Sequence, residues 1–291
     1  MDYLPLVSII VPVYNGERSL PVLLSALKAQ TYPKLEILIV DNNSTDSTAV
    51  ILQAQPSVRY IREEQPGSYA ARNAALALAK GEILAFTDDD CIPQPEWVSE
   101  GVRSLESSDF QLAGGAIHLR FSDKPRLAEW IDGSMFLNQA TYVTSNFAVT
   151  ANLFVHRQVF EHIGLFNAKL ISSGDAEFCR RACMHGFRIT YVETARVYHP
   201  TRKSLKALLR KAWRIGYGNG QLIAQNQGKM LENYLSLRAY GLPQPNFQRL
   251  RDMDIYLSYP QKLLCMVADY FVVILARNFG CVAGYLTANQ G

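Results

Sequence analysis

The amino-acid sequence predicts an α/β fold built on a Rossmann-like, mainly parallel sheet flanked by helices. Two observations predict it. Strand-like and helix-like segments alternate from residue 6 to residue 87, an order that gives a parallel sheet with right-handed crossovers. The first segment, residues 6–13 (LVSIIVPV), is apolar and β-branched almost throughout, as expected for a strand buried on both faces.

The other elements follow from the same patterns. The strands predicted in the first half are residues 6–13, 36–41, 57–62 and 82–87. Helices are predicted for residues 17–30, for a segment capped by Asn43-Ser44-Thr45-Asp46, and for residues 68–80. After residue 110 we expect strands at 110–119, 146–155, 187–192 and 195–198, a helix at 175–185, and mainly helices beyond Pro200. These patterns predict a domain at 1–200, with halves 1–115 and 116–200, and a helical C-terminal extension at 201–291.

The composition excludes several classes of protein. With 48% hydrophobic and 19% charged residues, the chain can build a sizeable core and is not globally disordered. Its net charge of +3 is too small to indicate a polyanion partner, and no nucleic acid is expected. The five cysteines are scattered and odd in number, which fits a reducing cytoplasm. A metal cluster of Cys179, Cys183 and His185 would lack a second ligand pair, so buried thiols are the simpler interpretation.

Polar residues follow each of the four predicted parallel strands. These segments are Pro12-Val13-Tyr14-Asn15-Gly16-Glu17, Asp41-Asn42-Asn43, Gly67-Ser68-Tyr69-Ala70-Ala71-Arg72-Asn73 and Asp88-Asp89-Asp90. Open α/β sheets bind ligands beyond the carboxyl ends of their strands. A lone aspartate at a strand end is usually a helix cap, but four such segments at one edge predict a binding site.

Asp88-Asp89-Asp90 places three carboxylates side by side, which costs stability unless a cation compensates. In an extended segment Asp88 and Asp90 point the same way, so the two can share one divalent ion. Oxygen ligands suit Mg²⁺ or Mn²⁺. The alternative is a solvated acidic turn before Pro93. The sequence lacks a phosphate-binding P-loop and a Gly-x-Gly-x-x-Gly motif, so kinase-like and nicotinamide-dependent chemistry has no support.

Taken together, the motifs of residues 6–215 resemble family 2 glycosyltransferases. The matching segments, in order, are VSIIVPVYN, ILIVDNNSTDST, GSYAARNAAL, ILAFTDDD, TANLFVHRQVFEHIGLFN and SGDAEFCRRACMHGF. The resemblance implies a GT-A fold, a nucleoside-diphosphate sugar as donor and an inverting mechanism.

The resemblance also implies roles for individual residues. Pro12, Tyr14 and Glu17 would line the nucleotide pocket, and Asp41 would accept a hydrogen bond from the base N3–H. Arg72 would lie near the base or the diphosphate. The acidic pair Asp88 and Asp90 would hold the metal and the diphosphate. His199 matches a histidine that approaches the metal or diphosphate in many relatives, although a purely structural histidine is the alternative.

The catalytic base is expected in the segment from Gly174 to Arg181 (GDAEFCRR), where Asp175, Glu177 and Arg181 match the family pattern. Asp175 is the predicted base. Gly174 departs from the usual glutamate, which leaves open whether a second carboxylate tunes the base. The alternative role for Asp175 is a helix N-cap.

The predicted function is metal-dependent, inverting transfer of one hexosyl or N-acetylhexosaminyl group. Mn²⁺ or Mg²⁺ is the expected cofactor, a UDP-sugar the favoured donor, and a glycan or lipid-linked hydroxyl the acceptor, in polysaccharide or glycolipid synthesis. Transfer of a single sugar is favoured because the Gln-x-x-Arg-Trp motif of processive synthases is missing from the sequence. The alternatives are a nucleotidyltransferase and a non-catalytic sugar-binding module.

The C-terminal third predicts contact with an anionic membrane surface, on the inner face of the plasma membrane. No acidic residue lies between Glu193 and Glu232, and a helix at 202–216 would carry apolar and basic faces. A helix with a solvated basic side is the alternative. Residues 263–285 are apolar but interrupted by Asp269 and Arg277. This pattern favours an interfacial helix, or pairing in a homodimer, over a membrane span.

Overall fold

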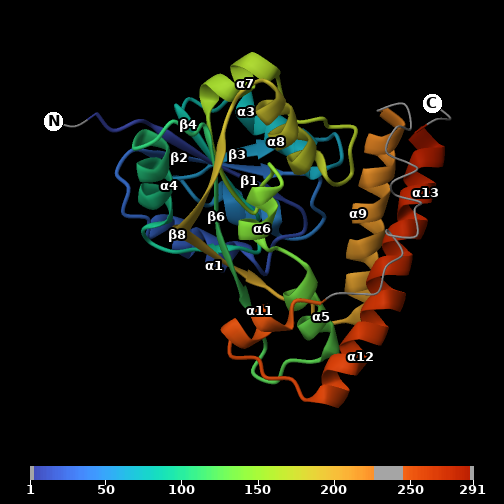
Figure 1. Ribbon diagram of the computed structural model, residues 1–291. Helices are drawn as coiled ribbons and strands as arrows, with labels where there is room; N and C mark the ends of the chain where they lie inside the picture. The colour runs from blue at the N-terminus through green and yellow to red at the C-terminus, as the bar shows by residue number, and fades with distance from the viewer. Residues whose placement is uncertain (1–2, 226–244, 289–291) are drawn as a thin grey trace. The chain divides into compact units, whose positions relative to one another are not determined.

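The computed structural model describes residues 3–225 and 245–288 (Figure 1). The chain divides into two compact units. Unit 1 comprises Met1–His118, Asn138–Lys169 and Gly174–Pro200, and unit 2 comprises Leu119–Leu137, Leu170–Ser173 and Thr201–Gly291. The domain boundaries predicted near residues 115 and 200 stay predictions, because compact units are defined by contacts and not by independent folding.

Unit 1 is built on an eight-stranded mixed sheet with the order β3-β2-β1-β4-β7-β6-β8-β5. The strands are β1 (Val7–Val13), β2 (Leu35–Asp41), β3 (Arg59–Arg62), β4 (Ile83–Thr87), β5 (Ile92–Pro93), β6 (Leu112–Arg120), β7 (Asn152–His156) and β8 (Ile189–Pro200). Strands β1 to β4 pair in parallel, whereas β7 is antiparallel to both β4 and β6. The α/β fold class is confirmed.

Helices cover this sheet (Figure 1). They are α1 (Leu20–Lys28), α2 (Thr48–Gln53), α3 (Ser68–Leu76), α4 (Trp97–Glu106), α6 (Gln139–Thr144), α7 (Arg157–Ile163) and α8 (Gly174–Met184). In α1 the buried side chains are Leu20, Leu23, Leu24 and Leu27, the spacing of one helical face. The core therefore fixes where each parallel strand ends, and with it the loops that follow.

Two predicted strand boundaries were wrong. The strands expected at 187–192 and 195–198 form the single strand β8, because Glu193 and Thr194 continue the extended backbone. The strand expected from residue 146 begins only at Asn152, whose backbone N–H closes a turn onto the carbonyl of Val149. Propensity alone does not show such turns.

Unit 2 is helical in its C-terminal part, as expected for the extension. Its helices are α5 (Leu127–Met135), α9 (Leu205–Gln225), α11 (Phe247–Asp252), α12 (Tyr259–Asp269), the π-helical segment η1 (Tyr270–Leu275) and α13 (Ala276–Ala288). A core of buried residues joins α5, α9 and α12–α13; it includes Ile131, Leu208, Ala212, Cys265 and Val273.

The apolar segment near the C-terminus forms a continuous helix from Tyr259 to Ala288, and the helical backbone passes through Asp269 and Arg277. By length and composition alone, it is the one helix within the described residues that could cross a membrane. Its most apolar 18-residue window has a mean hydropathy of 1.6, and 39% of that window is buried inside the protein.

Candidate active site

The loops that follow β1 and β2 are joined by hydrogen bonds into one edge of unit 1. Asn15 has a left-handed backbone (φ 54°), and its side-chain oxygen accepts a 2.8 Å bond from the backbone N–H of Thr45. The N–H of Gly16 donates to Thr48 Oγ1 at 2.8 Å, and Glu17 N–H donates to Asp46 at 3.1 Å. These bonds hold the carboxyl ends of two neighbouring strands in fixed register.

The residues predicted to line a nucleotide pocket lie along this edge. Pro12 is buried within β1, Tyr14 is 62% exposed just beyond it, and Glu17 is half-buried. Asp41 ends β2 with only 2% of its surface exposed. Its carboxylate accepts bonds from Ser44 N–H (2.9 Å) and from the Tyr60 hydroxyl (3.4 Å). Asp41 is therefore held in place by the protein.

The acidic segment after β4 is a turn and not the extended strand expected from the sequence. The backbone N–H of Cys91 donates to the carbonyl of Asp88 at 3.1 Å. Because the chain turns here, the three carboxylates point to three different partners, and the alternation argument does not apply. Asp88 meets Arg72, Asp89 meets Ser19, and Asp90 meets His199.

Arg72 supplies a cation for Asp88. Its Nη2 lies 2.6 Å from Asp88 Oδ1, and the guanidinium is 3% exposed. Burial raises the pKa of Asp175, and the positive charge of the same guanidinium offsets part of that rise. Part of the repulsion among the adjacent carboxylates is thus offset within the protein.

Asp89, the middle carboxylate of the three, is half-buried. It accepts a 2.5 Å hydrogen bond from Ser19 Oγ. Burial, with smaller contributions from Asp90 and Asp88, raises the pKa of Asp89 to about 7, while the Ser19 bond opposes this. Asp89 therefore ties the acidic turn to the start of α1.

Asp90 and His199 form the part of the site that best fits a divalent metal. His199 Nε2 lies 3.5 Å from Asp90 Oδ1, and His199 is 4% exposed. The Nδ1 of His199 lies 2.8 Å from the carbonyl of Pro200. A carbonyl only accepts, so Nδ1 carries a proton, and in the neutral ring Nε2 presents a lone pair toward Asp90. Two lone-pair donors at this separation favour a cation between them.

Cys91 completes the cluster by position: one ligand atom each from Asp90, Cys91 and His199 lies within 4.8 Å of the others. Burial raises the pKa of the Cys91 thiol well above its usual value, and its sulfur lies 3.8 Å from the carbonyl of Ala151. A protonated thiol is a poor metal ligand. Asp88 is not part of this cluster, and its role as a metal ligand stays a prediction.

Asp175, the predicted base, is the second residue of α8 and is half-buried. Desolvation raises its pKa, while the Ala176 N–H, which donates to Oδ1 at 2.9 Å, opposes the rise. The hydroxyl of Tyr69 lies 3.3 Å from the same carboxylate oxygen. That hydroxyl also accepts a 2.9 Å bond from the N–H of Gly174. Tyr69 therefore holds the beginning of α8 and its carboxylate together.

Gly174 allows this arrangement. A Cβ at position 174 would lie 2.7 Å from the ring of Tyr69, which is too close for any side chain. The next acidic residue, Glu177, is engaged elsewhere, because it forms a 2.7 Å ion pair with Arg181. Arg181 in turn donates to the carbonyl of Leu165 at 2.9 Å. Glu177 thus anchors α8 and leaves Asp175 as the carboxylate beside Tyr69.

All nine predicted site residues lie in unit 1. The structure brings Arg72 to Asp88 and Asp90 to His199. Sequence reasoning missed the roles of Tyr69 and Ser19. Tyr69 lies three residues before Arg72 on α3, so the two side chains share one face of that helix. This spacing could have predicted that Tyr69 also lies at the site. Ser19 offered none, because the pairing spans 70 residues.

Comparisons with known proteins identify the family of this chain. The model of the family "Glycosyl transferase family 2" matches residues 8–164. The chain is 38% identical over 228 residues to "Glycosyltransferase AglE" of Haloferax volcanii, covering 75% of this chain and 74% of that protein.

Solved structures show the same fold. The mannosyltransferase PcManGT from Pyrobaculum calidifontis, in complex with GDP-Man and Mn²⁺, superposes with a TM-score of 0.68 at 20% identity, over 98% of this chain and 88% of that one. Staphylococcus aureus TarS in complex with UDP-GlcNAc gives 0.56 at 17% identity, over 98% and 90%. The chain thus has the GT-A fold. The chain belongs to glycosyltransferase family 2.

Proposed function

We propose that this glycosyltransferase transfers a single sugar from a nucleoside-diphosphate sugar to an acceptor hydroxyl, with inversion at the anomeric carbon and with the help of a divalent metal. One observation carries the proposal. Unit 1 brings together a charge-compensated acidic turn (Asp88 with Arg72), a pair of side chains that could hold a divalent metal (Asp90 and His199) and a carboxylate at a helix start (Asp175).

Asp90 and His199 would hold the metal, and Asp88 is the third predicted ligand. The oxygen and nitrogen donors fit Mn²⁺ or Mg²⁺. When bound, the ion neutralises charge on the departing nucleoside diphosphate. The solved neighbour PcManGT contains Mn²⁺, which supports manganese for this chain. Arg72 supplies a fixed positive charge beside the same position.

Asp175 is the proposed general base. It would take the proton of the acceptor hydroxyl while the oxygen attacks the anomeric carbon and the bond to the diphosphate breaks. A single displacement of this kind inverts the configuration, so an α-linked donor gives a β-linked product. The raised pKa of Asp175 makes it a stronger base than an ordinary aspartate. Tyr69 would keep the carboxylate oriented through its hydroxyl, which lies 3.3 Å from Oδ1.

A UDP-sugar is the proposed donor, of the hexose or N-acetylhexosamine type. Asp41 is positioned by Ser44 and Tyr60 and would accept from the base N3–H, while Tyr14 would pack on the nucleotide. The solved neighbours are complexes with GDP-Man and with UDP-GlcNAc, so the same fold accepts more than one nucleotide. The proposed preference for uracil therefore rests on Asp41 and not on the fold. The proposed acceptor is a glycan or a lipid-linked glycan in polysaccharide or glycolipid synthesis.

A donor screen tests the proposal. The purified chain is incubated with Mn²⁺ and each of a set of UDP- and GDP-sugars, and the released phosphates are separated by ion exchange. We expect one donor to release nucleoside diphosphate. Chelation of the metal should abolish this release. In a parallel incubation with added inorganic pyrophosphate, formation of nucleoside triphosphate and sugar 1-phosphate from the donor would indicate a nucleotidyltransferase. Donor binding without turnover, with every acceptor class offered, would indicate a sugar-binding module.

A further inference from the structure

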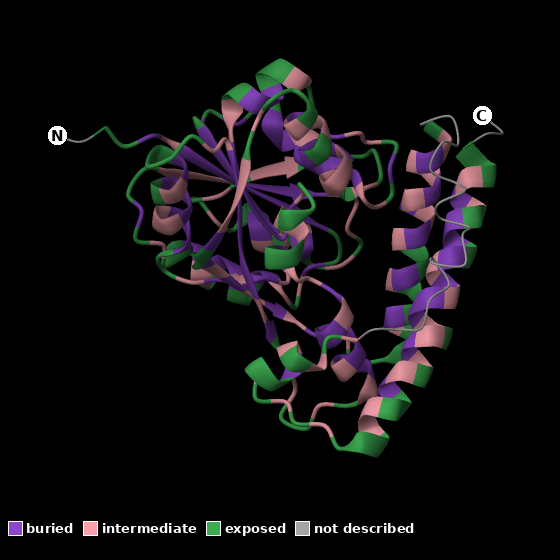
Figure 2. Ribbon diagram, viewed as in Figure 1, coloured by how far each residue is buried: buried purple, intermediate pink, exposed green. Residues whose placement is uncertain are grey.

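The outward face of the helix at residues 259–288 is apolar along its whole length. Its large exposed side chains are Tyr259, Leu263, Leu264, Val267, Phe271, Phe279, Val282 and Leu286, each between 40% and 80% exposed. Figure 2 shows exposed patches recurring along this helix. A helix that faces water normally carries polar side chains on its exposed side. The exposed side of this helix carries apolar side chains instead.

Two charges in the middle of this helix, Asp269 and Arg277, are turned toward the interior of unit 2. Asp269 is fully buried, and within the described residues neither of its carboxylate oxygens has a hydrogen-bond partner. Lys262 and Arg277 are half-buried. Charges inside and apolar side chains outside cost free energy in water on both faces. The arrangement suits a helix whose outer face meets hydrocarbon.

The π-helical segment η1 keeps this pattern in register. Phe271 and Phe279 are eight residues apart on the outside, and Asp269 and Arg277 are eight apart on the inside. Two ordinary α-helical turns take about seven residues, and the π segment accommodates one more. The extra residue therefore preserves both faces along the full helix.

Close packing against α9 fixes which face is turned outward. A Cβ at Gly220 on α9 would lie 2.0 Å from the carbonyl oxygen of Cys281, and one at Gly284 on α13 would lie 2.1 Å from that of Tyr217. The backbones touch at these glycines, so neither helix can rotate to hide its exposed apolar residues. Small residues spaced by four are also how helices pair within lipid.

The neighbouring helix α9 carries exposed basic residues. On α9 the exposed residues Lys206, Arg210 and Arg214 follow directly after the exposed residues Leu205, Leu209 and Trp213. The sequence between Glu193 and Glu232 contains no acidic residue. Lys229, part of the same basic run, lies outside the described residues.

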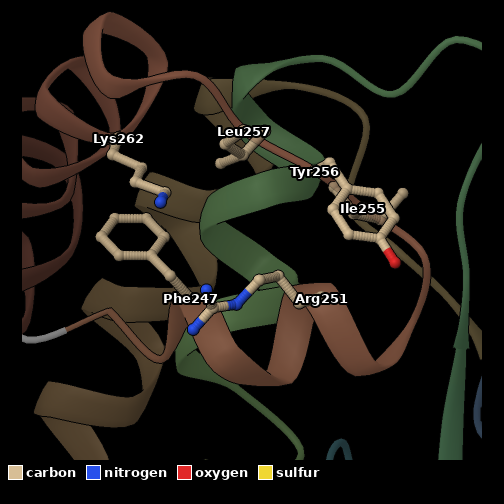
Figure 3. A pocket seen from close by; sticks show the side chains of 6 residues that line it. All are labelled: Phe247, Arg251, Ile255, Tyr256, Leu257 and Lys262. Carbon is tan, nitrogen blue, oxygen red and sulfur yellow. The ribbon is translucent and has the colours of Figure 1, made fainter.

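A small cavity near the start of α12 adds two more cations. Its volume is about 210 Å³, and Arg251 and Lys262 line it together with Phe247, Ile255, Tyr256 and Leu257 (Figure 3). Cationic side chains against an apolar wall match the phosphate and glycerol region of a phospholipid. The chemistry expected of a partner is therefore apolar and anionic together.

We propose that unit 2 docks on the surface of an anionic lipid bilayer. The apolar face of α12–α13 enters the boundary between headgroups and acyl chains, and the basic side chains of α9, with Arg251 and Lys262, contact lipid phosphates. A second copy of the chain is a poorer occupant, because pairing would bring like charges together. The inference is independent of the proposed sugar transfer.

Sedimentation of the full chain with vesicles tests the proposal. The vesicles contain phosphatidylcholine alone, or phosphatidylcholine mixed with phosphatidylglycerol, at low and high salt. We expect the chain to bind the mixed vesicles at least about tenfold more tightly than the phosphatidylcholine vesicles. High salt should weaken binding to the mixed vesicles. A chain that stays in the supernatant under every condition refutes docking. A chain that stays in the vesicle pellet after washes at high salt and at high pH would refute surface docking and indicate a spanning helix.

Matched variants locate the surface. Phe271→Asp and Phe279→Asp change residues that are 61% and 64% exposed, so the fold should survive, and each should weaken binding about tenfold or more. Val50→Asp on α2, at a residue 69% exposed in unit 1, should bind like the wild type. Circular dichroism confirms folding of all three variants.

A charge reversal with its own control separates lipid from a second copy. Arg210→Glu should weaken binding to anionic vesicles only, whereas Lys80→Glu in unit 1 should not; both residues are exposed. Analytical ultracentrifugation without vesicles follows the oligomeric state. A dimer that Phe271→Asp dissociates, without vesicle binding by the wild type, would assign this face to self-association and overturn the proposal.

Discussion

The hydroxyl of Tyr69 lies 3.3 Å from Oδ1 of Asp175, across 106 residues of sequence. Donation from this phenol stabilises the charged carboxylate, so Tyr69→Phe should raise the pKa of Asp175 further. We expect the acidic limb of the pH–rate profile to move to higher pH in the variant. A purely structural role would lower the rate equally at all pH values and would contradict a positioning role for Tyr69.

Asp175→Asn should leave donor affinity nearly intact and lower kcat by roughly 10²–10⁴, the usual contribution of a positioned general base. Glu177→Gln should have a smaller effect, because Glu177 is bound to Arg181. Steady-state kinetics and calorimetric titration of nucleoside diphosphate measure both quantities. If Glu177→Gln is inactive while Asp175→Asn is active, the base is assigned to the wrong residue.

The raised pKa of Asp175 also sets the sign of the pH dependence of activity. The base must be deprotonated to accept a proton, so kcat should fall as the pH drops through its pKa. Because burial raises that pKa above the ordinary 3.8, the fall should occur at higher pH than for an exposed aspartate.

Asp88→Asn and Asp90→Asn should both abolish metal-dependent binding of nucleoside diphosphate, but they should differ in stability. Asp88→Asn leaves the buried guanidinium of Arg72 without its counter-charge and should cost about 1–3 kcal/mol. From the sequence alone, relief of repulsion predicts unchanged or higher stability for both variants; the Arg72 pair reverses this for Asp88. Urea unfolding in chelator and calorimetry with and without Mn²⁺ measure these effects. Unchanged metal-dependent affinity in both variants would refute the site.

Asp269 should make the protein less stable as the pH rises from about 4 to 6. Burial raises its pKa to about 6 from 3.8. Between these values the folded chain holds a proton that the unfolded chain has lost, so unfolding becomes easier with rising pH. Relative to Asp269→Asn, the wild type should lose roughly 2 kcal/mol across this window. Asp252→Asn, on the exposed end of α11, is the control. If the free energy of unfolding of the wild type and of Asp269→Asn changes with pH in the same way, the pH dependence does not come from Asp269.

The sequence predicted the parallel half of the fold well, because continuous burial in strands such as residues 6–13 leaves a strong local pattern. It also identified the strand-end residues Asp41, Asp88 and Asp90. What it could not predict was which partner each carboxylate takes. The pairs Arg72–Asp88, Ser19–Asp89 and Tyr69–Asp175 join residues distant in sequence, and a turn after Thr87 redirects three adjacent side chains. Local patterns carry no information about such contacts.

The C-terminal helix shows the same limit. Asp269 and Arg277 interrupt an apolar run in the sequence, and this pattern favoured an interfacial helix, or pairing in a homodimer, over a membrane span. The structure forms one helix because both residues face the interior of unit 2, where α9 packs at Gly216 and Gly220. A one-dimensional hydropathy pattern does not distinguish an inward charge from an outward one.

The anomeric configuration of the product tests the central claim most directly. Proton NMR follows the wild-type chain with its α-linked donor, an acceptor and Mg²⁺, which avoids the line broadening that Mn²⁺ causes. The account predicts a β-linked product, formed together with nucleoside diphosphate, and no reaction after chelation of the metal. An α-linked product, or transfer that continues at full rate in chelator, would contradict metal-dependent single displacement by Asp175.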